Sequence, residues 1–228
     1  MRSIRAIIAV SALIAAAGCA TNRQPALETP PAELRILALG DSYTAGTAIP
    51  DGDAWPSKLA TTFADDGTVV DLTVVAGEGW NTKRLDREID RAGIDGTFDV
   101  VILAIGVNDV ILRFGIDNFR EGLASLAEDV ERRTGPEGTV VVLSIPDFRA
   151  APWGQERLDR NYDVEAYNED LGRLADDLGA TFVDITTMSS AAVGIPRLMA
   201  VDGVHFSGAM HDQWVELIVE SLSGEGPS

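Results

Sequence analysis

A serine, a histidine and an aspartate in this sequence have the types and spacing needed for nucleophilic catalysis. Ser42 follows an apolar run that ends in Gly40-Asp41, and His205 stands three residues after Asp202. A serine hydroxyl is a weak nucleophile until a base takes its proton, and histidine is the usual base near neutral pH. Asp202 is close enough along the chain to accept the other imidazole proton and fix the tautomer of that base. These residues therefore predict a serine nucleophile with a histidine base.

Structural roles are open for the same residues. Gly-Asp-Ser is also common in turns, and Ser42 is a candidate to cap the helix that follows it. His205 is also a candidate for a helix-capping or surface histidine. The sequence holds two histidines, and the second, His211, lies in a predicted helix beside Asp212 and Gln213, where we expect it on the surface. Of these two histidines, His205 is the favoured catalytic base, because Asp202 lies three residues before it.

Small polar motifs follow three of the predicted strands. Ser42 comes after the first strand, Gly79 after the second, and Asn108 after the third. Right-handed crossovers bring the carboxyl ends of parallel strands to one edge of a sheet, which is where open α/β sheets bind ligands. We therefore expect the three motifs to lie together at that edge.

Strands and helices alternate along the chain. Strands are predicted for runs rich in apolar and β-branched residues, at 34–40, 69–75, 99–105, 139–145 and 181–185. Helices are predicted where apolar residues recur every three or four positions, at 53–65, 82–92, 117–133, 164–178 and 208–222. Gly135, Pro136 and Gly138 are expected to end the third helix. This alternation predicts an α/β fold, a three-layer α/β/α sandwich with a central parallel sheet of about five strands.

The composition is that of an acidic globular protein. The 228 residues include 36 acids and 18 bases, a formal net charge of −18, and 46% are hydrophobic. Such a surface repels phosphate backbones, so no nucleic acid partner is expected. The length suits one domain with a large core and some targeting sequence. The single cysteine, Cys19, excludes an internal disulfide and a cysteine-rich metal site.

The N-terminal segment has the pattern of an export signal. Arg2 and Arg5 precede an apolar stretch that is too short to span a membrane, and the stretch ends in Ala17-Gly18-Cys19. Basic, apolar and small-residue regions in this order predict a secretory signal. Small residues immediately before a cysteine also resemble the bacterial lipobox, at which the cysteine is lipidated. An ordinary signal peptide with a chance cysteine is the alternative.

These features divide the chain into three parts. We expect a lipoprotein-type signal peptide at 1–18, an anchor cysteine with a polar, proline-containing tether at 19–33, and the folded domain at 34–223. The protein is then exported and held at the cell envelope as a lipoprotein, or is otherwise secreted. Contact with a membrane is expected only through the N-terminal lipid.

Four sequence blocks follow one another along the chain: Gly40-Asp41-Ser42, Gly79, Gly106-Val-Asn108-Asp109 and Asp202-Gly-Val-His205. In this order they resemble the blocks of the SGNH hydrolases, also called the GDSL esterases and lipases. The resemblance implies a flavodoxin-like sandwich with Ser42 as nucleophile, His205 as general base and Asp202 as the acid that orients it. It also implies an oxyanion hole made by the backbone amides of Ser42 and Gly79 and the side-chain amide of Asn108.

Two positions depart from the family pattern. Tyr43 replaces the leucine of the family name, at a position that varies. The second block lacks the usual asparagine before its glycine and offers both Gly77 and Gly79. Gly79 is favoured as the oxyanion donor because the residues after it resemble the family's continuation into a helix.

The resemblance implies a serine esterase that hydrolyses carboxylic esters of small molecules or glycans, as an acyl esterase or a carbohydrate O-deacetylase. It implies no cofactor and no metal. The Gly-x-Ser-x-Gly, Walker A and His-Glu-x-x-His motifs of other enzyme classes are absent from the sequence. Two alternatives are acyl transfer to an envelope glycan and a lipoprotein that binds a glycan or a partner without turnover. Trp55, Trp80 and Trp153 are candidates for a sugar platform or an acyl-chain wall, and core packing is as plausible for Trp55.

Overall fold

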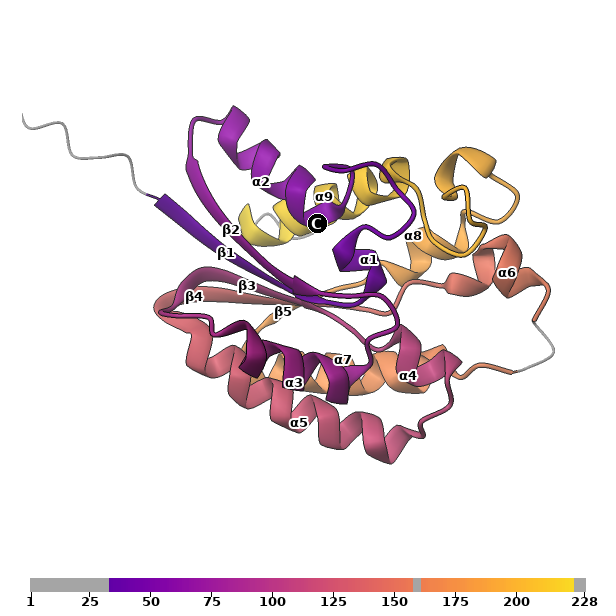
Figure 1. Cartoon of the computed structure of the whole chain (residues 1–228), viewed down its shortest axis with the longest axis horizontal. Coiled ribbons are helices and arrows are strands. Elements are labelled where there is room, and N and C mark those ends of the chain that lie inside the picture. Colours follow the sequence, from indigo (N-terminus) through magenta and orange to yellow (C-terminus); the bar gives the residue numbers. More distant parts are fainter. Residues whose placement is uncertain (1–32, 158–160, 224–228) are drawn as a thin grey trace, which may run out of the picture. The chain divides into compact units, whose positions relative to one another are not determined.

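A parallel sheet of five strands is the centre of the computed structural model, which describes residues 33–157 and 161–223 (Figure 1). The strand order is β2-β1-β3-β4-β5, and each neighbouring pair is parallel. The strands are β1 (Glu33–Gly40), β2 (Val69–Ala76), β3 (Phe98–Ala104), β4 (Thr134–Leu143) and β5 (Thr181–Val183). The expected α/β fold with a central parallel sheet is confirmed.

Helices cover both faces of this sheet. The long helices of the described residues are α2 (Trp55–Asp65), α3 (Thr82–Ala92), α5 (Ile116–Arg133), α7 (Val164–Leu178) and α9 (Gly208–Ser223). Helix α5 packs between α3 and α7 on one face, and α2 packs on α9 on the other (Figure 1). The result is the three-layer sandwich that the alternation of strands and helices predicted.

The core lies where the sequence is most continuously apolar. The side chains of Ile36 to Leu39 in β1 and of Val101 to Leu103 in β3 are fully buried, as expected for central strands covered on both faces. Helix α5 buries Phe119, Leu123, Leu126 and Val130, the face that its spacing predicted. The edge strands are less covered, and Val74 of β2 and Phe182 of β5 are exposed.

Strand β4 begins earlier than the sequence indicated. It starts at Thr134, and the segment 135–138, expected to be a break, belongs to it. The register between β3 and β4 shifts there, since Phe98 pairs with Thr134 and Val100 with Thr139. Such an irregularity accommodates glycine and proline without placing proline in the regular ladder. The strand then ends at Leu143 instead of the expected position 145.

Short helices that the sequence patterns did not indicate occupy the carboxyl edge of the sheet. They are α1 (Ser42–Ala45), α4 (Val107–Ile111), α6 (Pro152–Gln155), α8 (Thr186–Ser190) and the 3-10 turns η1 (Phe148–Ala150) and η3 (Pro196–Leu198). Four or five residues give too little apolar periodicity for a pattern to be recognised. Helices α1 and α4 follow β1 and β3 directly, and so they position the motifs at the ends of these strands.

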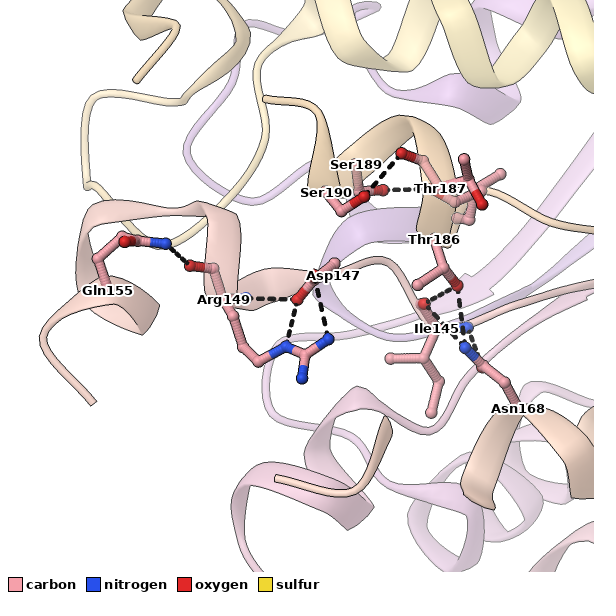
Figure 2. Close-up of polar contacts among 10 residues, drawn as sticks. Ile145, Asp147, Arg149, Gln155, Asn168, Thr186, Thr187, Ser189 and Ser190 are labelled. Carbon is pink, nitrogen blue, oxygen red and sulfur yellow. Dashed lines mark hydrogen bonds and ion pairs between the residues drawn. The ribbon is translucent and has the colours of Figure 1, made fainter. Parts of the chain in front are cut away.

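The connection after β4 is anchored by polar contacts (Figure 2). Asn168 of α7 accepts a hydrogen bond from the Ile145 N–H at 2.7 Å and donates to Thr186 Oγ1 at 2.9 Å. Thr186 Oγ1 in turn donates to the Ile145 carbonyl at 2.8 Å. Further along, Asp147 accepts from the backbone and the guanidinium of Arg149. These bonds fix the start of the segment that leads to Trp153.

None of the helices in the described ranges is long and apolar enough to cross a membrane. The predicted signal peptide at 1–18 and the anchor cysteine Cys19 lie outside the described residues, as does the predicted tether up to residue 32. These assignments stay predictions.

Candidate active site

Ser42, His205 and Asp202 form an unbroken line of hydrogen bonds at the carboxyl edge of the sheet. His205 Nε2 lies 2.9 Å from Ser42 Oγ, and His205 Nδ1 lies 2.6 Å from Asp202 Oδ2. An ionised carboxylate only accepts hydrogen bonds, so the proton of the neutral imidazole belongs on Nδ1. Nε2 is then free to accept the hydroxyl proton of Ser42, which is the arrangement a general base needs.

The end of β1 is shaped so that Ser42 can occupy this place. A side chain at Gly40 would put its Cβ 2.1 Å from Thr44 Oγ1, so only glycine lets α1 fold back over the strand. Asp41 caps α1 by accepting a hydrogen bond from the Tyr43 N–H at 3.0 Å. The alternative role of Ser42 as a helix cap is therefore wrong, because Asp41 fills it and Ser42 is the first residue of the helix.

Asp41 and Asp202 are both carboxylates near the serine, and their surroundings shift their pKa values in opposite directions. Burial raises the pKa of Asp41 to about 7, with a smaller contribution from the charge of Asp109. Burial also acts to raise the pKa of Asp202, but hydrogen bonds from the His205 side chain and from two backbone N–H groups outweigh it and lower the value. Asp202 is thus the carboxylate that stays charged beside the imidazole.

The loop before α9 holds the base in place. Asp202 Oδ1 accepts the N–H groups of Val204 at 2.9 Å and His205 at 3.0 Å, which closes the loop onto its own carboxylate. The ring of Tyr43 packs edge-on against the imidazole, with centroids 5.3 Å apart. The position of the family leucine therefore carries a side chain that supports His205, a contact that sequence reasoning missed.

The second block contains two glycines in very different surroundings. A Cβ at Gly77 would lie 2.3 Å from the indole of Trp80, so this residue is covered by the ring. Gly79 has φ +71°, is exposed, and has no atom within 4 Å of the place where a Cβ would stand. Of the two glycines, Gly79 is the one whose surface is open to an incoming molecule.

Asn108 and Asp109 tie the third block to the second. Asn108 Nδ2 donates to the Trp80 carbonyl at 2.9 Å, which uses one of the two amide protons and leaves the other for a bound group. Asp109, 1% exposed, accepts from the Thr82 N–H at 3.0 Å and from Thr82 Oγ1 at 2.9 Å. Burial raises the pKa of Asp109. Sequence reasoning gave Asp109 no role, although its place directly after Asn108 was the available signal.

The sequence matches the GDSL-like Lipase/Acylhydrolase family over residues 38–213, a range that contains all four blocks. The chain belongs to this family. The matched range begins in β1 and ends in α9, so the folded part of the chain is the GDSL-like acylhydrolase domain.

Two relatives of this GDSL-like acylhydrolase and one solved structure show the degree of similarity. A multidomain esterase of Ruminococcus flavefaciens is 23% identical over 239 residues, which cover 88% of this chain and 30% of that protein. An isoamyl acetate-hydrolyzing esterase 1 homolog of Bos taurus is 25% identical over 197 residues, which cover 78% of this chain and 73% of that protein. A variant of an acetyl xylan esterase from Geobacillus stearothermophilus superposes with a TM-score of 0.64 at 19% identity, over 83% of this chain and 94% of that one. The structural likeness supports the fold alone.

His211 of the acylhydrolase domain is not on the surface, contrary to expectation. It is 1% exposed, and its Nδ1 accepts the backbone N–H of Trp55 at 2.9 Å. Its ring packs against the indole of Trp214, with ring centroids 4.5 Å apart. Burial lowers the pKa of His211 to about 3. His211 is buried because α9 packs on α2. At this contact it accepts one of the first N–H groups of α2, which have no acceptor within their own helix. This histidine therefore supports the fold.

The three tryptophans expected near the rim of the acylhydrolase site differ in burial. Trp55 is fully buried, so the core-packing alternative holds for it. Trp80 and Trp153 are half-buried. The backbone N–H of Trp153 donates at 2.9 Å to the carbonyl of Gly203, which belongs to the loop 202–205 that holds His205. Within the described ranges, no group of three or more histidine, cysteine, aspartate and glutamate side chains is placed to hold a metal ion.

Proposed function

We propose that this protein is a serine esterase in which Ser42 is the nucleophile, His205 the general base and Asp202 the carboxylate that orients it. The observation that carries the proposal is the line of hydrogen bonds from Asp202 through the imidazole to Ser42 Oγ. Ser42 Oγ attacks the ester carbonyl carbon while its proton passes to His205 Nε2. The tetrahedral intermediate then loses the alcohol, which takes that proton, and an acyl-serine is left. Water, activated by the same imidazole, releases the acid.

The oxyanion of the intermediate is stabilised by three donors in this proposal. Ser42 is the first residue of α1, so its N–H has no acceptor within the helix. The Gly79 N–H lies in the open segment after β2, and the second amide proton of Asn108 is not used by the bond to Trp80. Donors of this kind act most strongly when negative charge develops on the carbonyl oxygen.

The proposed substrates are carboxylic esters of small molecules or glycans, so that the protein acts as an acyl esterase or a carbohydrate O-deacetylase. The relative from Bos taurus is named as a homolog of an isoamyl acetate-hydrolyzing esterase, which supports this class. Acyl transfer to an envelope glycan uses the same residues, and no described feature favours it over hydrolysis. The non-catalytic alternative is disfavoured because the hydrogen-bonded set is complete.

We further propose that the protein is exported and anchored by a lipid on Cys19. The support is the sequence pattern of a basic region, a short apolar stretch and small residues before the cysteine. In a bacterial host, the wild-type protein is expected in the membrane fraction with a lipidated mature N-terminus at Cys19. Cys19→Ser is expected to abolish lipidation and processing at that site. A wild-type mature chain that begins elsewhere, without lipid, would refute the anchor.

A fluorophosphonate probe tests the nucleophile. The probe is expected to label the wild-type protein and to fail on Ser42→Ala, while circular dichroism shows that the variant is folded. A series of 4-nitrophenyl esters from acetate to palmitate, with acetylated sugars alongside, then defines the acyl and alcohol preference. Labelling that survives in Ser42→Ala would remove Ser42 from its proposed role.

A further inference from the structure

A cavity of about 360 Å³ opens beside Gly79, and none of the catalytic steps above uses it. It lies where the segment after β2, the start of α3, the residues after α4 and the start of α5 come together; Figure 1 shows α3 and α5 side by side there. The lining residues are Gly79, Asn81, Lys83, Arg87, Asp109, Leu112, Phe114 and Asn118. The cavity therefore shares Gly79 with the proposed oxyanion hole.

Two cations line this cavity. Arg87 is exposed and makes no ion pair or hydrogen bond with any residue in the described part of the chain. Lys83 Nζ donates to Asn118 Oδ1 and to Glu121 Oε2, both at 2.8 Å. An ammonium group has three protons to donate, so one remains. Donors for an anion are thus available from both side chains.

The lining itself holds no exposed carboxylate, and Glu121, which pairs with Lys83, lies outside it, so among the described residues Arg87 is the lining cation whose charge is not opposed by an ion pair. The one acidic residue of the lining is Asp109, which is 1% exposed and whose two oxygens are taken by Thr82. In a chain with a net charge of −18, a cavity with this balance is unusual. Leu112 and Phe114 add an apolar wall, with 54% and 45% of their surfaces exposed. The combination fits an anionic group carried on a short apolar stem.

The position of the cavity says which part of an ester would enter it. In the proposed reaction the carbonyl oxygen lies between the donors of Gly79 and Asn108, and the leaving oxygen must approach His205 Nε2. Neither Ser42 nor His205 lines the cavity, so a group held there beside Gly79 does not occupy the place of the leaving oxygen and belongs to the acyl part. We infer that this cavity binds a carboxylate at the far end of the acyl group, with Arg87 and Lys83 as its partners. The inference rests on the proposed esterase function and adds a substrate class to it.

The test compares an anionic and a neutral ester with the same leaving group. For mono-4-nitrophenyl glutarate and 4-nitrophenyl valerate, the ratio of kcat/KM values is expected to fall about tenfold in Arg87→Ala and to fall again in Arg87→Glu. The wild-type ratio is expected to decrease with ionic strength, because charges near the surface are screened by salt. Lys83→Met is expected to act in the same direction as Arg87→Ala.

Arg91→Ala is the matched control, because Arg91 lies one turn further along α3, is bonded to Glu88 and does not line the cavity. It is expected to keep the wild-type ratio. Equal ratios in Arg87→Ala and Arg91→Ala would overturn the inference. Turnover of the neutral valerate ester tests the esterase proposal alone, whereas the ratio of the two esters tests the cavity, so the two proposals can fail independently.

Binding of glutarate provides a readout that needs no turnover. By isothermal titration calorimetry, Ser42→Ala is expected to bind glutarate, and the double variant with Arg87→Ala is expected to bind it about tenfold more weakly. No binding to Ser42→Ala, or equal affinities in the two proteins, would overturn the assignment of the cavity even if the esterase proposal holds.

Discussion

The two sides of Ser42 are built in different ways. On the base side, made of Ser42 and the loop 202–205, Asp202 reaches an imidazole only three residues away and also accepts two N–H groups of the same loop. On the oxyanion side, made of the segment 77–82 and α4, the bonds join residues 27 and 28 positions apart. The Asp202–His205 pair of the base side is thus a local structure that meets Ser42 across 163 positions of sequence, whereas the bonds of the oxyanion side exist only when β2 and β3 are already placed in the sheet.

The two sides also use their carboxylates differently. Asp202 keeps a lowered pKa next to His205, so it remains charged when the imidazole takes up a proton. Asp109 is buried, its pKa is raised, and its oxygens receive the N–H and the hydroxyl of Thr82. The first stabilises a charge that appears during the reaction, and the second holds two chain segments together. Replacing the imidazole of His205 should therefore affect mainly chemistry, and changes on the oxyanion side should affect chemistry and stability.

The largest effect is expected on the base side. His205→Ala removes the general base, so kcat for 4-nitrophenyl acetate is expected to fall by roughly 10⁴-fold or more. Steady-state kinetics on folded protein measures it. The chain offers a matched control in its other histidine, His211.

His211→Ala should behave in the opposite way. It leaves the Trp55 N–H without an acceptor and is expected to lower the free energy of unfolding by about 1–3 kcal/mol, with kcat retained in the folded fraction. If the two alanine variants lost activity to the same extent, the assignment of His205 as the base would be wrong.

A smaller loss is expected for one oxyanion donor. Asn108→Ala should lower kcat by roughly 10²–10³-fold with a smaller change in KM, because the bond strengthens as charge develops in the transition state. Asn108→Asp should be at least as harmful, since its carboxylate repels the developing anion. Measuring kcat together with thermal stability separates this role from a structural one. Near-normal kcat in well-folded Asn108→Ala would contradict the oxyanion assignment.

The same contrast explains how far the sequence could be interpreted. The order of strands and helices followed from periodicity, and the pairing of Asp202 with His205 followed from a spacing of three residues. The choice of Gly79 over Gly77 rested on resemblance, and the reason for it is tertiary: the Trp80 indole covers Gly77. Local signals therefore predicted the base side better than the oxyanion side.

Contacts between distant segments account for what was missed. No local pattern indicates that Asp109 receives Thr82, or that His211 accepts the N–H of a residue 156 positions away. A histidine followed by polar residues in a helix, as His211 is by Asp212 and Gln213, is expected on the surface until a second helix packs over it. The early start of β4 was missed for a similar reason, since glycine and proline enter a strand only where the neighbouring strand allows a register shift.

Asp109→Asn tests whether the oxyanion side combines chemistry with stability. An asparagine amide cannot accept two bonds with both of its terminal atoms, so one donor of Thr82 loses its partner. The free energy of unfolding is expected to fall by about 1–3 kcal/mol, which for a chain of this size lowers the melting temperature by about 3–10 °C. Because the Thr82 contact then no longer fully fixes the segment that carries Gly79 against α4, while the Asn108–Trp80 bond remains, kcat should fall by about tenfold.

Thr82→Ser, which keeps the hydroxyl, is the conservative control for this pair, and Thr82→Val is its disruptive counterpart. The double variant Thr82→Val with Asp109→Asn is expected to lose less than the sum of the single losses, because both changes break the same contact. Additive losses, or a fall in melting temperature with kcat unchanged, would show that Asp109 does not position the donors.

The smallest effect on activity is expected at Asp41, which precedes Ser42 in the chain, is buried and is influenced by the charge of Asp109 on the oxyanion side. Asparagine still accepts the Tyr43 N–H, so Asp41→Asn should change kcat little. Its effect should appear in stability against pH. The folded-state pKa of about 7 lies above the ordinary aspartate value of 3.8, so between these values the folded protein keeps a proton that the unfolded chain releases. The contribution of Asp41 to stability therefore falls as pH rises through this window, by up to roughly 4 kcal/mol.

Urea unfolding midpoints between pH 4.5 and 8 measure this dependence. The wild-type curve should fall relative to that of Asp41→Asn as pH rises, and the difference should level off above about pH 7. Other groups titrate in the same range, but they are common to both proteins and largely cancel in the difference. The cancellation is least complete for Asp109, because its charge contributes to the raised pKa of Asp41. In an Asp109→Asn background, the pH at which the stability difference caused by Asp41→Asn levels off should therefore be lower. Parallel curves for the wild type and Asp41→Asn would mean that the Asp41 carboxyl is solvated or paired, and that the two sides of Ser42 are electrostatically independent.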